Sequence, residues 1–557
     1  MNRRHLLLGL LLSLAICPYF VDLDGSSIWD ANEAFYVETP REMMERGDYV
    51  SPTFNYEPRQ NKPILSYWIV AAFYQLFGVS VAVQRIPMAL GAVALIGTAF
   101  FLAFVAAPQA SVLSRRIDAG LWAALGLAIT PRLLMFARRI FIDIYISMFM
   151  GLTLLFFALA ERYPSRRRLF LALMYVAVGL GVLTKGPIAI LLPGIVFALY
   201  LLLHRELGRI RAMMLPAGIL IVGAIVIPWY AAVYVREGWE PIKSFILGEN
   251  VARYTAGVGV DTVRGPFFYV PVLFSDSFPW SMFLFAAAAA WFADRRRTSA
   301  SDPTLRIRDL LWLWIIVIVG FFTISAAKQD LYIFPIVPAI TALAGIFIVQ
   351  GLDEGRRGLR PSAVVVGAVM ALAGAGVLYL VGSPTGTYVF EGARIMGLVG
   401  VCGGLGVAAL AGAHRYRASL LAIIVTFVLL DWVFVLRVLP GFERYKPVPG
   451  FARTLAPRLQ KDDLVVTYFE ALPSLVFYLR RHVDPLFSSG EFFERFQSGR
   501  TVYAVLSMDN YRDIAEQIGV ETCILERRAT FDVKLKNMYA RQPPPELVLI
   551  TNRCSNH

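Results

Sequence analysis

Residues 79–116 read VSVAVQRIPMALGAVALIGTAFFLAFVAAPQASVLSRR, and this stretch decides the fold. Its apolar part continues to residue 105 and is long enough to cross a bilayer as a helix, which needs roughly 20 apolar residues. It ends shortly before a pair of arginines, which mark a loop outside the hydrocarbon. Similar apolar runs of roughly 17 to 25 residues recur along the chain. The 557-residue chain is 57% hydrophobic and has a mean hydropathy of +0.60, as is typical of a polytopic membrane protein.

The predicted fold class is therefore mainly α. Backbone groups in hydrocarbon must be hydrogen bonded within the span, so these runs form helices, and the alternating pattern of a membrane barrel is absent. We expect a polytopic bundle of about 13 transmembrane helices, followed by a C-terminal periplasmic α/β domain. The expected spans are 6–21, 79–105, 118–135, 143–160, 168–184, 187–203, 213–235, 269–292, 309–326, 332–350, 362–381, 394–413 and 418–438.

The distribution of arginine sets the expected orientation. Alternate loops carry arginine clusters, for example at 115–116, 166–168 and 295–297, which is the positive-inside pattern of cytoplasmic loops. Two arginines at 3–4 precede the first span, so we expect a cytoplasmic N-terminus and a first span that is retained as an anchor. With an odd number of spans, we expect the first acidic loop and the tail on the far side of the membrane, which is the periplasmic side if the membrane is a bacterial inner membrane.

Cations on the opposite, far-side loops break this pattern. They stand mostly alone, beside proline or aromatic residues. An arginine fork or a lysine charge at the outer mouth of a bundle is what a lipid phosphate or pyrophosphate needs. Snorkelling toward ordinary head groups is the alternative, and the pattern alone leaves both open. The far-side cations are Arg59, Lys62, Arg132, Arg138, Arg139, Lys185, Lys243, Arg253, Arg264 and Lys328.

The first far-side loop is also rich in carboxylates. Its sequence WDANEAFYVETPREMMERGDYVSP, residues 29–52, predicts short helices at the interface. Asp30 and Glu33 are three residues apart and share one face if the turn between them is helical. A carboxylate at the membrane surface can accept the proton of an acceptor hydroxyl. Helix capping is the alternative, for which Asp30 or Asn32 is well suited, and the local pattern leaves base and cap both open.

The tail changes character. Short apolar runs at 464–469, 502–506, 523–525 and 547–550 alternate with polar helical patterns, which predicts an α/β domain. We therefore divide the chain into a membrane domain, 1–440, with far-side loops at 22–78 and 236–268, and a periplasmic α/β domain, 441–557. Cys523 and Cys554 both lie in this tail and either form a disulfide or stay as two reduced thiols.

Five far-side stretches resemble the GT-C membrane glycosyltransferases related to protein O-mannosyltransferases and to the lipid A aminoarabinose transferase. The stretches are NEAFYVETPREMMERGDYVSPTFNYEPRQNKPILSYW (32–68), FIDIYISMF (141–149), LTKGPIAILLP (183–193), ENVARYTAGVGVDTVRGPFFYVPVLFSDSFPW (249–280) and SAAKQDLYIFPIVPA (325–339). One such motif is weak, whereas five in order on the predicted outer face are strong. The resemblance covers most of residues 1 to 350.

The resemblance implies glycosyl transfer from a polyprenyl-phosphate sugar donor to an acceptor hydroxyl of a lipid or glycan. On this basis we assign the donor phosphate to Lys62, Lys185 and Lys328. Arg59 and Arg253 are second choices, and Arg138 and Arg139 are third. The family also has an acidic residue at the position of Asp143, so Asp143 is carried over as a site residue.

Departures from the family pattern affect both the base and the metal. The family's first loop acid is Asn32 here, which leaves Glu33 and the displaced Asp30 as candidate bases. Some relatives bind a divalent metal through a Glu and a His whose matching positions hold Asn61 and Asn250. Two amides make a poor zinc site, so we predict no required metal and no other cofactor, while an oxygen-ligated Mg²⁺ near the carboxylates stays open.

Other functions fit less well. A lipid-linked oligosaccharide ligase or polymerase needs the same outer cations and a base. A transporter needs charges near the middle of the membrane or repeated broken helices, and neither pattern is present. A structural scaffold gives no reason for the far-side cations. Membrane lipids are expected partners, and nucleic acid is not.

Overall fold

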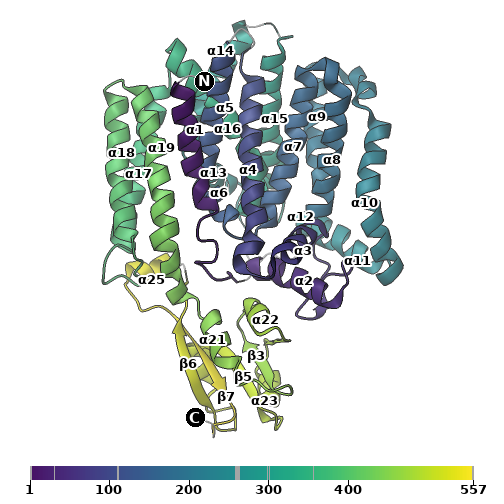
Figure 1. Cartoon of the computed structure of the whole chain (residues 1–557), viewed down its shortest axis with the longest axis vertical. Helices are drawn as coiled ribbons and strands as arrows, with labels where there is room; N and C mark the ends of the chain where they lie inside the picture. Colours follow the sequence, from purple (N-terminus) through teal and green to yellow (C-terminus); the bar gives the residue numbers. More distant parts are fainter. Residues whose placement is uncertain are drawn as a thin grey trace.

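Apolar length accounts for the helices of the bundle. The computed structural model describes residues 3–30, 32–108, 112–257, 264–297, 299, 301–355, 357–532 and 534–554. Residues 258–263 of the predicted loop at 236–268 thus lie outside the described residues. Figure 1 shows a helical bundle with the α/β tail at one end and the N-terminus at the other. The long helix α4 (Val81–Ala106) has 26 residues, or about 39 Å at 1.5 Å per residue, which exceeds the hydrocarbon thickness.

The helices that follow the expected spans have these bounds: α1 (Arg3–Ile16), α4, α5 (Leu113–Ala128), α6 (Pro131–Ala137), α7 (Ile142–Arg162), α8 (Arg167–Lys185), α9 (Ile188–Leu203), α10 (Leu215–Glu237), α13 (Tyr269–Asp276), α14 (Leu284–Arg297), α15 (Pro303–Ile324), α16 (Val337–Glu354), α17 (Leu359–Leu380), α18 (Ala393–Gly412) and α19 (Tyr416–Val433). Short helices and turns between them are η1 (Cys17–Tyr19), α2 (Asn32–Arg46), α3 (Leu65–Phe77), η2 (Pro164–Arg166), η3 (Leu207–Met213), α11 (Glu240–Lys243), the π-helix η4 (Ser244–Ala252), α12 (Arg253–Ala256), η5 (Trp280–Phe283), η6 (Asp330–Ile336), the π-helix η7 (Phe434–Val438), α20 (Leu439–Gly441) and η8 (Phe442–Tyr445).

The expected count of 13 spans is not confirmed. Nine of the described helices are long and apolar enough to cross a membrane, or eleven spans if each of two bent pairs counts as one. The bend between α5 and α6 is 67°, because Pro131 follows an extended Thr130 and the proline lacks the N–H that would continue the helix. Two expected spans correspond to α1 and α9, which have only 14 and 16 residues.

The tail has the predicted α/β character. Its sheet has the strand order β4-β3-β5-β7-β6, with parallel pairing of β3 to β4 and β5, and antiparallel pairing of β7 to β5 and β6. The strands are β3 (Leu464–Tyr468), β4 (Asp484–Leu486), β5 (Val502–Ser507), β6 (Cys523–Ala529) and β7 (Glu546–Thr551). The helices are α21 (Val448–Leu455), α22 (Ser474–Leu479), α23 (Ser489–Gln497), α24 (Met508–Ile514) and α25 (Leu535–Tyr539).

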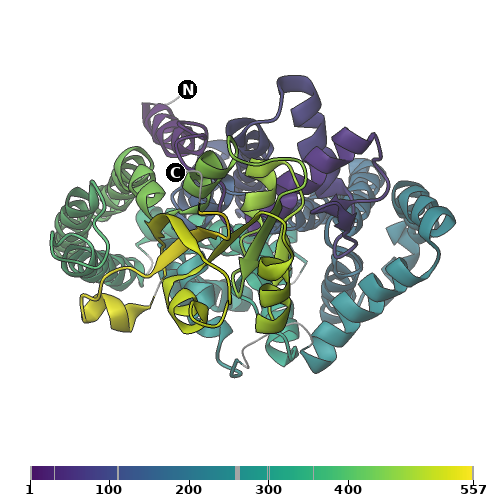
Figure 2. The ribbon, with the colours of Figure 1, turned by 90° about the horizontal axis from the view of Figure 1, so that it is seen from below.

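Apolar residues cover both faces of this sheet. Phe451 of α21 and Leu475 of α22 are buried on one face, and Phe492 and Phe496 of α23 are buried on the other. Seen from below, the tail lies beneath the bundle, between α17 and α18 at one edge and α10 at the other (Figure 2). The predicted boundary between 440 and 441 falls inside α20, and the division into two domains stays a prediction.

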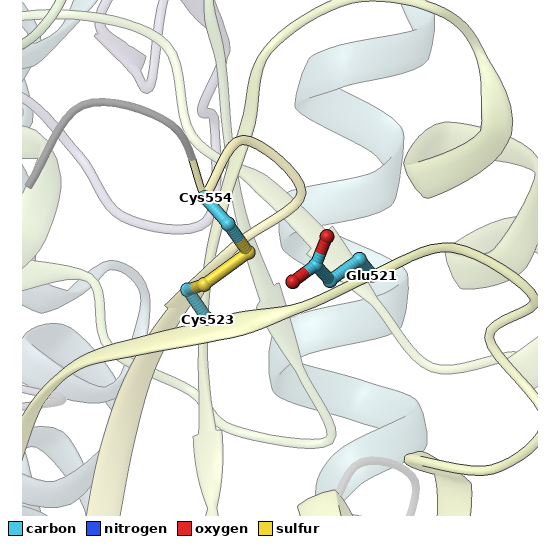
Figure 3. Close-up of side chains that lie close together, drawn as sticks. All are labelled: Glu521, Cys523 and Cys554. Atoms are coloured by element: carbon cyan, nitrogen blue, oxygen red, sulfur yellow. A yellow bond between two sulfur atoms is a disulfide. The ribbon is translucent and has the colours of Figure 1, made fainter.

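Cys523 and Cys554 form a disulfide, which settles the alternative left open by the sequence. It joins the start of β6 to the segment after β7. The Glu521 carboxylate lies beside the two sulfurs (Figure 3). Within the part of the chain that the structure describes, these three residues are the one group with metal-ligand spacing, but bonded sulfurs are not thiolate ligands.

The tail is hydrogen bonded to the first far-side loop at two places. Asn55 lies in the turn between β1 (Thr53–Phe54) and β2 (Glu57–Pro58), and its side chain exchanges two 2.9 Å hydrogen bonds with the backbone of Val483. Near the start of the loop, the Ile28 N–H donates to the Tyr478 hydroxyl at 2.9 Å. These contacts fix the loop from the tail side.

A buried ion pair fixes the same loop from the bundle side. Glu33 of α2 and Arg85 of α4 are 2% and 1% exposed, and Arg85 donates to both carboxylate oxygens at 2.8 and 2.9 Å. Arg85 also donates to the carbonyls of Leu23 and Ser26, at 2.7 and 2.6 Å. Burial raises the pKa of Glu33, but the Arg85 charge and its hydrogen bonds outweigh burial and leave the pKa below the ordinary value of 4.5.

Replacing Glu33 by Gln is therefore expected to destabilise the protein. The variant leaves the buried Arg85 without a counter-charge, which costs about 3–5 kcal/mol in the free energy of unfolding. Because Glu33 has a lowered folded-state pKa, its contribution is present above pH 4.5 and is lost as the pH falls through the folded-state value. Thermal unfolding of purified protein in detergent measures the effect. Glu57→Gln, at an exposed carboxylate on β2, is the matched control, and equal melting of the two variants contradicts the expectation.

Candidate active site

A cavity of about 770 Å³ opens at the end of the bundle that faces the tail. Its walls come from α2, the segment after β2, the start of α7, the junction of α8 and α9, the π-helix η4 with α12, and the segment from the end of α15 into η6. Apolar and aromatic side chains form much of the lining. The charged lining residues are Arg59, Lys62, Asp143, Lys185, Glu249, Arg253, Arg264 and Asp330.

Lys185 and Asp143 form an ion pair on one wall. Lys185 is the last residue of α8 and Asp143 lies in the first turn of α7. The lysine Nζ also lies 5.1 Å from the centre of the Tyr332 ring. Gly186 ends the helix with φ +90°, and a Cβ there would come within 2.7 Å of the Phe245 ring. Glycine at this position therefore lets the chain turn directly after the lysine.

Lys62 and Arg253 meet at a single carboxylate on another wall. The Oε2 atom of Glu249 accepts from Lys62 Nζ at 3.3 Å and from Arg253 at 2.8 Å. Burial, together with the charges of Lys185 and Arg253, lowers the pKa of Lys62 from its ordinary 10.5, although Glu249 opposes the shift. One carboxylate oxygen thus serves both cations.

Arg59 carries a positive charge that no carboxylate neutralises within the described part of the chain. Its guanidinium stacks 3.9 Å from the centre of the Phe35 ring, and its buried Nε has no hydrogen-bond partner. Its own backbone N–H is held by the Pro52 carbonyl at 2.9 Å. Arg264 similarly lies 4.4 Å over the Phe268 ring. These guanidiniums add anion-binding capacity to the lysines.

Of the three candidate acids, the structure places only Asp143 in the cavity. Glu33 is committed to the buried pair with Arg85. Asp30 accepts the Ser474 N–H at 2.7 Å and so contacts the tail. Asn32, which stands where the family has its first acid, does line the cavity. Neither Asp30 nor Glu33 is therefore positioned at the cavity.

Of the predicted cations, Lys62, Lys185, Arg59 and Arg253 line the cavity together and Lys328 does not. Lys328 is 7% exposed and donates to the Ser325 carbonyl at 2.6 Å. The third choices also lie elsewhere. Arg138 donates to the carbonyls of Pro18, Val21 and Asp22, each at 2.6 Å, and Arg139 stacks 3.5 Å over Trp29. These arginines hold the exit of the first helix.

Glu249 and Asp330 are lining residues that were not predicted from the sequence, and Arg264 is a predicted far-side cation that was not assigned to the donor phosphate. Glu249 is four residues before Arg253, the spacing of side chains that pair along a helix. This spacing is the one sequence signal that could have indicated Glu249. Asp330 is held by Arg132, which also pairs with Asp276 at 3.0 Å. Nothing in the local sequence indicates that Asp330 faces a cavity.

The metal-ligand positions of the family do not suit a metal here. Asn61 and Asn250 both line the cavity, and the Asn250 Nδ2 donates to the Phe245 carbonyl at 2.8 Å. The neighbouring carboxylate, Glu249, is engaged with two cations. Amide side chains and a cation-bound carboxylate are a poor donor set for zinc.

The sequence and the fold of this chain are similar to those of known proteins. Residues 61–231 match the family described as dolichyl-phosphate-mannose-protein mannosyltransferase. An undecaprenyl phosphate-alpha-4-amino-4-deoxy-L-arabinose arabinosyl transferase of Pseudomonas fluorescens (strain Pf0-1) is 28% identical over 380 residues, which are 67% of this chain and 63% of that protein. An uncharacterized protein of Aquifex aeolicus (strain VF5) is 31% identical over 337 residues, which are 59% of this chain and 61% of that protein. The chain thus spans less than two thirds of the length of these relatives.

The fold is also known from crystal structures. ArnT from Cupriavidus metallidurans bound to undecaprenyl phosphate superposes with a TM-score of 0.77 at 23% identity, covering 98% of both chains. At this identity the likeness shows the shared fold. The chain is thus similar over residues 61–231 to this mannosyltransferase family, and over nearly its whole length it has the fold of ArnT.

Proposed function

We propose that this protein transfers a sugar from a polyprenyl-phosphate donor to an acceptor hydroxyl at the membrane surface. One observation carries the proposal: a single cavity at the bundle end contains the cations Arg59, Lys62, Lys185 and Arg253 together with the acid Asp143. Cations stabilise a phosphate leaving group, and an acid beside them can accept the proton of the attacking hydroxyl.

The donor class follows from the relatives. The P. fluorescens relative is named for an undecaprenyl phosphate sugar, and the C. metallidurans ArnT structure contains undecaprenyl phosphate. We infer that the donor here is an undecaprenyl phosphate-linked sugar and that the acceptor is a hydroxyl of a lipid A-like lipid, a glycan or a protein. The proposed location is the bacterial inner membrane, with a cytoplasmic N-terminus and with the cavity and tail on the periplasmic side. We infer no required metal, since amides occupy the ligand positions.

The cations assist the departure of the phosphate leaving group. The acceptor oxygen attacks the anomeric carbon as the bond from that carbon to the phosphate oxygen breaks. The bond electrons stay on the phosphate, which leaves on the lipid with an added negative charge. Lys62 and Arg253 would bind this charge together with Arg59, which lines the same cavity. Attack from the face opposite the phosphate inverts the anomeric carbon.

Asp143 is the carboxylate we assign to the proton of the acceptor hydroxyl. It lines the cavity, and among the candidate acids from the sequence it alone does so. The ion pair with Lys185 orients its carboxylate at the start of α7. This assignment replaces Glu33, whose carboxylate is held by Arg85.

Asp143→Asn is expected to lower the turnover about 10²- to 10⁴-fold without a matching loss of donor binding, because an amide cannot accept the proton. Mass spectrometry of envelope lipids and glycans, in a strain lacking the gene and in complemented strains, identifies the modified acceptor and measures its formation. Asp24→Asn, at an exposed carboxylate of the first far-side loop and away from the cavity, is the control. An unchanged profile on deletion refutes the enzyme, and full rescue by Asp143→Asn refutes the base.

Lys62 gives the binding site an expected pH dependence. Its pKa is lowered from 10.5, so it loses its charge at a lower pH than an ordinary lysine, and phosphate affinity falls with it. Between about pH 7 and pH 10 the affinity for undecaprenyl phosphate should decline several-fold in the wild type and stay nearly flat in Lys62→Arg, because arginine keeps its charge. Equal pH profiles of the two proteins, measured in lipid nanodiscs, would remove Lys62 from the phosphate site.

A further inference from the structure

Glu249 holds two cavity cations with one oxygen. It lies in the π-helix η4, and its side chain is 32% exposed toward the cavity that it lines. Its Oε2 atom is 3.3 Å from Lys62 Nζ and 2.8 Å from the Arg253 guanidinium. Lys62 is 187 residues away in sequence, on the first loop, so the contact joins two separate loops.

A phosphate oxygen can accept from the same two donors, Lys62 and Arg253. A phosphate accepts charge-assisted hydrogen bonds from arginine and lysine at distances of about 2.7–2.9 Å, and its oxygens commonly bridge two cations. Both partners of Glu249 line the cavity where the proposed function puts the lipid phosphate. The carboxylate and the phosphate therefore need the same two donors.

Charge decides how the two anions compete. The sugar donor is a phosphodiester and carries one negative charge, and the Glu249 carboxylate also carries one negative charge. After transfer, the lipid product is a phosphomonoester of about −1.5 to −2 charge, which binds the same cations more strongly. A product held this firmly leaves slowly unless another anion replaces it on the cations.

We propose that Glu249 is a built-in competitor of the lipid phosphate, which replaces the spent polyprenyl phosphate on Lys62 and Arg253 and so speeds its release. This inference rests on the proposed function and adds a role for a carboxylate that the transfer chemistry does not use. A purely structural Glu249 makes the opposite prediction, because removing it would disorder the two cations and weaken phosphate binding.

Binding of undecaprenyl phosphate to the full-length protein in nanodiscs separates these outcomes. Glu249→Gln removes the competing charge and is expected to tighten binding about tenfold, the worth of one hydrogen bond to a charged group. Undecaprenol, which lacks the phosphate, should bind equally to wild type and variant. Glu240→Gln is the matched control, since Glu240 pairs with Lys243 on the same loop, is exposed and does not line the cavity.

Turnover provides a second readout. Because product release slows in Glu249→Gln, inhibition by added undecaprenyl phosphate should strengthen while the first turnover stays fast. Unchanged or weaker binding of undecaprenyl phosphate by Glu249→Gln overturns the inference. If that variant does not fold, Glu249→Asp, which keeps the charge but shortens its reach, must bind more tightly than wild type, and equal or weaker binding overturns the inference. A wild type that does not bind undecaprenyl phosphate refutes the proposed function itself.

Discussion

A buried ion pair joins the first far-side loop to the bundle and fixes the start of α2. Glu33 and Arg85 are both almost fully buried, and Arg85 also binds the carbonyls that lead into α2. Removing two charges from water is costly, so such a pair persists only when each charge satisfies the other with good geometry. Here that geometry fixes the start of α2, the helix that carries Phe35 to the cavity wall beside Arg59. The position of the cationic loop thus depends on a contact outside the cavity.

The cavity itself holds an excess of positive charge that is only partly neutralised. Asp143 neutralises Lys185, and one carboxylate serves both Lys62 and Arg253. Partial pairing keeps the cations ordered at the membrane boundary while leaving them able to exchange partners. A fully paired site would resist an anionic ligand, and an unpaired one would cost more to desolvate than the fold can support.

Hydropathy predicted the mainly α bundle and the tail because apolar length and alternation are local properties. Its count of 13 spans is not confirmed, because 9 described helices, or 11 spans with the two bent pairs, are long and apolar enough to cross a membrane, and α1 and α9 are shorter. Four of the five donor-phosphate residues line the cavity, because they sit on far-side loops that converge on one end of the bundle. The roles of the candidate acids were harder to predict from the sequence. The Glu33 carboxylate is not free to act as the base because it is paired with Arg85. Arg85 is 52 residues away in the sequence, and no local pattern reveals that partner.

The hydrogen bonds between Asn55 and Val483 have a consequence for how the protein matures. They join residues 428 positions apart, so the hairpin that precedes Arg59 receives its last support only when the tail has been synthesised and folded. A nascent chain that has not yet reached residue 483 can insert its first helices but lacks the hydrogen bonds that hold the hairpin before Arg59. The hairpin that leads into Arg59 is therefore completed late in the synthesis of the chain.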